Sequence, residues 1–229
     1  MLARGIAAPN IERVWRRFSD SYFLQHSPEE AAWHMRLLAD RDPSCDEPLV
    51  ALDPRSVHGT TAVLIFTRLL EHGFERTTAV LDQLGLNVVD ARITPTGDGF
   101  SLDLYHVLED DGAPIADGER REEIEQALWR SLHHPEQSVA VHRRVPRQAR
   151  MFHTPTQIAI SVDERNARSV IELIAGDRPG LLYDVGKVLT GEGIMLQAAK
   201  IVTVASGPRT SSTSPTSTAV RSRRRARRA

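Results

Sequence analysis

The feature that most limits the fold of this chain is a pattern that occurs twice. The segment LDQLGLNVVDARI, which ends at Ile93, aligns with LTGEGIMLQAAKI, which ends at Ile201, at an offset of 108 positions. In both copies a helical pattern ends at a glycine, Gly85 or Gly193, and a strand pattern follows. This repetition predicts two copies of one small domain.

The predicted elements have the order of a ferredoxin-like α+β domain. In the first copy, apolar periodicity predicts strand, helix, strand, strand and helix over residues 61–67, 74–85, 86–94, 100–108 and 117–132. In the second copy it predicts strand, helix and strand over residues 170–175, 181–193 and 194–204. A further strand at 156–161 either closes the first copy or belongs to the second. The first copy therefore matches the split βαβ arrangement, with four antiparallel strands and two helices on one face.

A small helical segment precedes the repeats. Its first helix places apolar residues on one face, and these are Ile11, Val14, Trp15 and Phe18. Its second helix starts with Ser27 as N-cap, Pro28 at the first helical position and Glu30 at the capping-box position. His26 and His34 could be metal ligands, but no cluster of further ligands stands near them in the sequence. We therefore interpret both histidines as part of the packing of this segment.

Composition and charge exclude several classes of protein. The 229 residues carry a formal net charge of -1, which argues against a chain that binds polyanions or membrane surfaces as a whole. No apolar run approaches the roughly 18 residues that a membrane span needs. No secretory signal precedes the first helix, so we expect a cytoplasmic protein. The single cysteine, Cys45, excludes a disulfide framework and a cysteine-built zinc site.

The segment ELIAGDRPGLLYDVGKVL contains a strand-to-helix corner at Asp177, Arg178, Pro179 and Gly180. In a βαβ unit such a corner presents the unpaired N–H groups and positive dipole end of the helix, which favour a carboxylate ligand. Gly180 permits close backbone approach, and Asp177 can cap the helix or accept a ligand ammonium. The corner thus suits an amino acid zwitterion. The alternative is structural, with Asp177 only capping the helix and Gly180 only turning the chain.

These segments resemble two known families. DRPGLLYDVGKVLTGEGIMLQAAKI is similar to an ACT domain, a small βαββαβ module that binds amino acids and regulates metabolic enzymes. SDSYFLQHSPEEAAWHMRLL, LGLNVVDARITPTGDGFSLDLYHVLEDDGAPI and RRVPRQARMF resemble, in that order, the C-terminal third of the bifunctional uridylyltransferase/uridylyl-removing enzymes, which modify the nitrogen-signalling protein PII. This second resemblance runs from about Asn10 to Val204.

The second resemblance implies a role for the corner. In that family two ACT domains sense glutamine, and a nucleotidyltransferase domain and an HD phosphohydrolase domain precede them. The ligand-binding residues that it implies here are Asp177, Arg178, Pro179, Gly180, Leu181 and Leu182. The corresponding corner of the first copy reads Leu69, Leu70, Glu71, His72 and Gly73. This first corner lacks the Asp and the Pro, which puts ligand binding there in doubt, and we interpret His72 as a solvent-facing loop residue.

The chain contains none of the catalytic motifs that the family implies. It has no paired metal-binding aspartates after a Gly-Ser turn and no His-Asp doublet. We therefore expect no catalytic residue, no metal site and no cofactor in it, and magnesium and UTP are implied only for the full-length enzymes. The expected partners are glutamine or another amino acid, PII for the full-length family, and a second ACT sheet through self-association.

The expected organisation ends in a tail that does not fit the repeat. We expect a helical segment at 1–54, a first ACT domain at 55–142, a linker and strand at 143–168, an incomplete second ACT repeat at 169–204 and a disordered tail at 205–229. The tail is rich in Ser, Thr and Pro and ends in arginines. One choice of codons for residues 204–222, read one base earlier, encodes DVFYITDEHGRPL, which aligns with DLYHVLEDDGAPI at Asp103–Ile115. We interpret the tail as the product of a one-base frame change near Val204, and the alternative is a genuine basic tail.

Three functions follow from these patterns. The first is the glutamine-sensing regulatory region of a uridylyltransferase/uridylyl-removing enzyme that controls nitrogen assimilation, and the resemblance upstream of the repeats favours it. The second is a free-standing ACT regulator that binds an amino acid and acts on a partner enzyme. The third is an interaction protein that uses the arginine-rich tail on nucleic acid, and the charge of the remaining chain opposes it.

Overall fold

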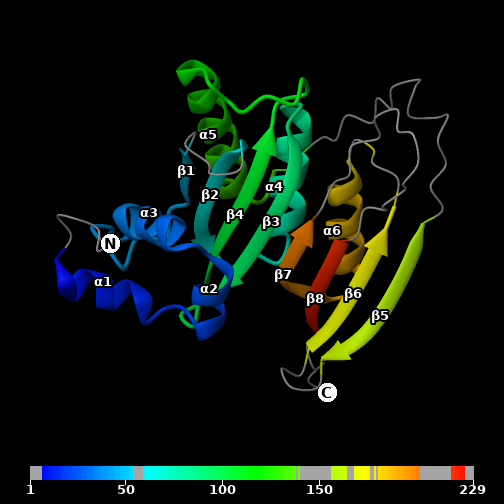
Figure 1. The fold of residues 1–229 in the computed structure, drawn as a ribbon, viewed down its shortest axis with the longest axis horizontal. Helices are drawn as coiled ribbons and strands as arrows, with labels where there is room; N and C mark the ends of the chain where they lie inside the picture. Colours follow the sequence, from blue (N-terminus) through cyan, green and yellow to red (C-terminus); the bar gives the residue numbers. More distant parts are fainter. Residues whose placement is uncertain are drawn as a thin grey trace.

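The computed structural model describes residues 7–53, 59–137, 139, 156–163, 168–175, 178, 180–201 and 218–224. These residues form two four-stranded antiparallel sheets, with strand orders β1-β2-β4-β3 and β5-β6-β8-β7 (Figure 1). In both sheets the two strands that flank the first helix of the unit are separated by a third strand. This is the split order of a ferredoxin-like domain, so the structure confirms the predicted α+β class.

The predicted elements of both copies are present and follow each other in the predicted order. In the first unit, which follows helices α1 (Ala8–Trp15), α2 (Asp20–Gln25) and α3 (Pro28–Leu38), the elements are β1 (Leu49–Asp53), β2 (Thr61–Arg68), α4 (Gly73–Gln83), β3 (Asn87–Pro95), β4 (Phe100–Leu108) and α5 (Gly118–His133). In the second unit they are β5 (Gln157–Asp163), β6 (Arg168–Ile174), α6 (Leu181–Gly191), β7 (Ile194–Ile201) and β8 (Thr218–Arg224). No helix among the described residues is long and apolar enough to span a membrane.

The first sheet is covered on both faces. Val63 and Ile65 of β2 belong to the core beneath α4 and α5, whereas Leu64 and Phe66 belong to the core beneath the N-terminal helices. Because successive side chains of a strand point to opposite faces, a strand buried on both faces is continuously apolar. This explains the unbroken run TAVLIFT, and it makes the first unit a three-layer structure.

The N-terminal segment folds as three helices rather than the two that periodicity predicts. The predicted capping box at the start of α3 is confirmed, since the Glu30 backbone N–H donates to Ser27 Oγ at 3.2 Å and the Ser27 N–H donates to Glu30 Oε2 at 2.7 Å. Ile11, Val14 and Phe18 are buried. Trp15 differs from the prediction, because it is 39% exposed and its ring lies edge-on to that of Phe23.

The expected helical segment at 1–54 differs from the structure near its C-terminal end, where a strand forms. Leu49–Asp53 form β1, which pairs with β2 along the outer edge of the first sheet. Its backbone is held by α5, because the Leu52 N–H donates to Glu125 Oε1 at 3.0 Å. Strand β5 pairs with β6 in the second sheet, so the predicted strand at 156–161 belongs to the second copy. The prolines around residues 43–54 interrupt the strand pattern, although β1 pairs with the next strand in the sequence.

The tail contributes a strand, which differs from the expected disorder of 205–229. Thr218–Arg224 form β8, and Val220 is the register partner of both Ile171 in β6 and Ala199 in β7. The split order separates β6 from β7, so an antiparallel strand between them can pair with both. β8 thus occupies the place that β4 has in the first sheet. Residues 202–217 and 225–229 lie outside the described part of the chain.

Candidate functional site

The two units lie side by side, with β3 beside β7 and α4 beside α6 (Figure 1). The helices approach each other closely at Gly186 of α6, where an added Cβ would lie 3.1 Å from the Cα of Glu75 in α4. Near the other end of α4, the Gly180 N–H at the start of α6 donates to Asp82 Oδ1 at 2.8 Å. Since residue 180 faces residue 82 and residue 186 faces residue 75, the two helices run antiparallel.

The structure describes four of the six predicted ligand-binding residues, while Asp177 and Pro179 lie outside the described residues. Arg178 is exposed and forms an ion pair with Asp184 at 2.6 Å. Gly180 has a φ of 73° and is the N-cap of α6, which explains the need for glycine there. Leu181 and Leu182 are half-buried, and Leu182 packs against the core of the first unit.

A carboxylate of the protein itself therefore stands at the second corner. Asp82 lies near the C-terminal end of α4, where the helix dipole disfavours a negative charge. Its contact with the Gly180 N–H places it instead at the N-terminal, positive end of α6. In this structure Asp82 provides the carboxylate that the corner was predicted to attract.

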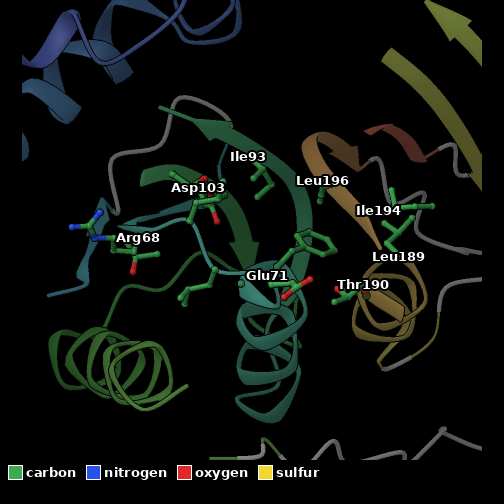
Figure 2. A pocket seen from close by; sticks show the side chains of 15 residues that line it. Arg68, Glu71, Ile93, Asp103, Leu189, Thr190, Ile194 and Leu196 are labelled. Atoms are coloured by element: carbon green, nitrogen blue, oxygen red, sulfur yellow. Dashed lines mark hydrogen bonds between the residues drawn. The ribbon is translucent and has the colours of Figure 1, made fainter. Parts of the chain in front are cut away.

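The first corner faces a cavity instead. The repeat offset of 108 positions relates Asp82 to Thr190, so the residue that faces the first corner carries no carboxylate. A cavity of about 40 Å³ lies here, between the two units (Figure 2). Its lining from the first unit is Thr67, Arg68, Leu69, Leu70, Glu71, Gly73, Phe74, Ile93, Ser101 and Asp103, and from the second unit Gly186, Leu189, Thr190, Ile194 and Leu196.

Asp103 is the buried charged group of this cavity. It lies on β4, between register partners Ile65 of β2 and Ile93 of β3, and is only 5% exposed. Ser101 Oγ donates a hydrogen bond to Asp103 Oδ1. Burial raises the pKa of Asp103 to about 7, although the hydrogen bond from Ser101 opposes this rise. No cation of the described residues pairs with this carboxylate, so the cavity can accept a cationic group.

The start of α4 adds a second polar group to the same cavity. Its N-cap, His72, makes no side-chain capping hydrogen bond, and its ring instead contacts Glu75 Oε2 at 3.0 Å. The positive end of the α4 dipole lies near Gly73, which lines the cavity and whose own N–H donates to the Leu70 carbonyl at 3.2 Å. A positive helix end and a buried carboxylate on one cavity match the two charges of an amino acid.

The site residues predicted from the sequence do not include Asp103, although the strand pattern around it contains a signal. Tyr105 and Val107 lie on the same face of β4 as Asp103 and belong to the core beneath the helices. A carboxylate in this otherwise apolar register is unusual, because buried acids are rarely left without a partner. The alternation within FSLDLYHV could have indicated Ser101 and Asp103 as candidates.

The histidines of the N-terminal segment belong to a buried polar network. Tyr22 Oη lies 2.8 Å from His34 Nδ1, and Glu30 forms an ion pair with Arg92 of β3 at 3.0 Å. Burial alone would raise the pKa of Glu30, but hydrogen bonds from His106 and His26 bring it well below its usual range. Burial lowers the pKa of His34 to about 3. Within the described residues, no group of three or more His, Cys, Asp or Glu side chains could hold a metal ion.

Comparisons with known proteins give similarities along most of the chain. Residues 1–37 match a family model described as the uridylyltransferase GlnD fifth domain. A bifunctional uridylyltransferase/uridylyl-removing enzyme of Methylococcus capsulatus is 42% identical over 203 residues, and one of Stutzerimonas stutzeri is 37% identical over 209 residues. These alignments cover 88% and 89% of this chain but 23% of each relative, so the chain spans about a quarter of their length. A crystal structure of aspartate kinase from Synechocystis is 14% identical with a TM-score of 0.39, over 72% of this chain and 24% of that chain.

Proposed function

Because the chain belongs to the family of bifunctional uridylyltransferase/uridylyl-removing enzymes, of whose length it spans about a quarter, we propose that it is their glutamine-sensing C-terminal regulatory region. The observation that carries the proposal is the cavity between the two units, which is lined by the buried carboxylate of Asp103 and the start of α4. The ligand then binds at the corner of the first copy, because the carboxylate of Asp82 occupies the corner of the second copy.

The size of the cavity connects ligand binding to regulation. About 40 Å³ is room for one or two water molecules, which is less than a whole amino acid requires. Glutamine would therefore move α6 and β7 away from the first corner as it enters. The two units then have a closed and an open arrangement, and a ligand that binds only the open one shifts their populations. In a full-length enzyme this shift would bias the addition and removal of UMP.

The remaining expectations concern the partners of the full-length enzymes and the residues of the second corner. PII, magnesium and UTP belong to the parts of the full-length enzymes that this chain does not span, and the cytoplasm is where the enzymes would act. Of the candidate ligand residues at the second corner, Gly180 then docks α6 onto α4 through Asp82 and Arg178 pairs with Asp184 of α6, rather than binding glutamine directly. A free-standing amino acid regulator would use the same cavity, since both of its walls come from this chain.

We also propose that the residues after Val204 result from a one-base frame change. The relatives match 89% of the 229 residues, which is about 204 residues, so the unmatched share equals the tail in length. β8 replaces the strand that the other frame would encode, in the same place in the sheet. Sequencing the genomic DNA across codon 204 tests this, and a frame that stands as written would contradict it.

Calorimetric titration of the full chain with L-glutamine tests the proposed function. Thr190→Leu should fill the cavity and abolish the binding heat, whereas Thr190→Ser should retain it, because serine keeps the hydroxyl that bonds the Gly186 carbonyl at 2.9 Å. Equal binding by both variants would place the ligand elsewhere. An absence of heat with the wild-type chain would refute the proposed function.

A further inference from the structure

Asp103 is a buried carboxylate that no cation of the described residues neutralises. Its side chain lies on a cavity wall, its hydrogen bond partner is the neutral Ser101, and no arginine, lysine or histidine of the described residues pairs with it. A carboxylate buried without a cation is costly, and the cost is recovered when a cation enters. The geometry therefore assigns Asp103 a role that the packing of the fold does not require.

We propose that Asp103 receives the α-ammonium group of the amino acid ligand, so that only ligands with this group bind well and the carboxylate must be ionised. This inference rests on the proposed function and names the residue that determines specificity within the same cavity. It places the ammonium group at the inner end of the cavity, beneath the first corner. The side chain of the ligand then extends toward the exposed Glu71, which lies on the side of Asp103 that faces α6 (Figure 2).

Among the described residues that line the cavity, Asp103 is the one buried charge. From β2, Arg68 lines the cavity but forms a bidentate pair with Asp46, at 3.0 Å for both bonds. Glu71 at the corner is exposed to solvent. The next inward-facing residue of β4, Tyr105, is buried and uncharged at neutral pH, because burial raises its pKa further above the ordinary value. The lining residues of the second unit carry no charge.

The same burial makes ligand binding depend on pH. Burial raises the pKa of Asp103 to about 7 in the ligand-free protein, so below pH 7 the carboxyl carries a proton. A ligand ammonium favours the ionised form, and this proton must leave when the ligand binds. Affinity for L-glutamine should therefore be constant above about pH 8 and fall about tenfold for each pH unit below 7.

Titration calorimetry of the full chain between pH 5.5 and 8.5 tests the inference, with L-glutamine and 4-carbamoylbutanoate as probes. The second probe is glutamine without its α-ammonium group. The wild-type chain should prefer L-glutamine at pH 8 by about tenfold to a hundredfold, as expected for a hydrogen bond between charged groups. Asp103→Asn should abolish this preference and the pH dependence. Glu122→Gln, which neutralises an exposed carboxylate on α5, should change neither.

Each outcome decides a different part of the reasoning. If Asp103→Asn binds L-glutamine with the wild-type affinity and pH dependence, the inference is wrong and the proposed function stands. Comparable wild-type affinities for both probes at pH 8 would also overturn it, and this measurement needs no variant that could misfold. If neither probe binds the wild-type chain at any pH, both the inference and the proposed function fail.

Discussion

Replacement of Gly186 by alanine tests the close contact between the two units. In the middle of a helix this change normally stabilises, by about 1 kcal/mol, because alanine is the better helix former. Here the new methyl group would lie 3.1 Å from both Glu75 Cα and Phe74 Cδ1 and 3.3 Å from Glu75 Cβ. Since one of these neighbours is helix backbone, α6 as a whole must move away from α4.

The magnitude follows from these two opposed effects. Overpacking a well-packed contact costs roughly 1–3 kcal/mol. After the gain in helix propensity, we expect Gly186→Ala to destabilise the second unit by about 0–2 kcal/mol. Gly191→Ala is the matched control, because Gly191 ends the same helix and an added Cβ there meets nothing within 4 Å. The control should be neutral or stabilising, by up to about 1 kcal/mol.

Urea denaturation, followed by circular dichroism and by amide hydrogen exchange, provides the measurement. The two variants should differ by roughly 1–3 kcal/mol in the free energy of unfolding of the second unit. The exchange protection of α5 and β2 should stay unchanged, because neither lies at the contact. If Gly186→Ala stabilises the chain as much as Gly191→Ala does, the two helices are not in close contact and the cavity between the units loses its support.

Other perturbations test the remaining parts of the structure. Glu30→Gln should lower the free energy of unfolding by roughly 1–3 kcal/mol in urea at pH 7, because Arg92 loses one of its two carboxylate partners and keeps only Asp90, and an unchanged midpoint would contradict this. The neutral His34 ring, with its pKa lowered to about 3, contributes stability that is complete above its unfolded pKa of about 6.5 and is lost as the pH falls toward 3. His34→Gln should flatten this slope between pH 7 and 4, and parallel slopes would count against it. We expect self-association through the edge strand β5, where Ile160 is 71% exposed, so Ile160→Lys should reduce the association measured by sedimentation velocity, and an unchanged association would contradict this. A chain that stops before Thr218 lacks β8 and should lose exchange protection in β6 and β7 while β2 and β4 keep theirs, and retained protection would show that β8 is dispensable.

The sequence by itself determined the local elements and their order. The glycines that end the helical patterns of the two copies, Gly85 and Gly193, have φ values of 71° and 67°, as expected for residues that end helices in the left-handed conformation. The Ser27–Glu30 capping box also follows from residues close together in the chain. Periodicity and capping could predict these features because each depends on contacts within a few turns or a single strand.

Only the tertiary structure decided which strands pair and where the site lies. β1 and β8 have weak patterns of their own. β1 pairs with the next strand, β2, and its backbone also bonds Glu125 of the distant helix α5, while β8 pairs with both β6 and β7. The cavity depends on the packing of one repeat against the other, which closes the second corner with Asp82 and leaves the first corner facing Thr190. The two corners thus differ in the residue that faces them from the opposite helix, Asp82 or Thr190, as well as in their own sequence, because each corner is completed by the other copy.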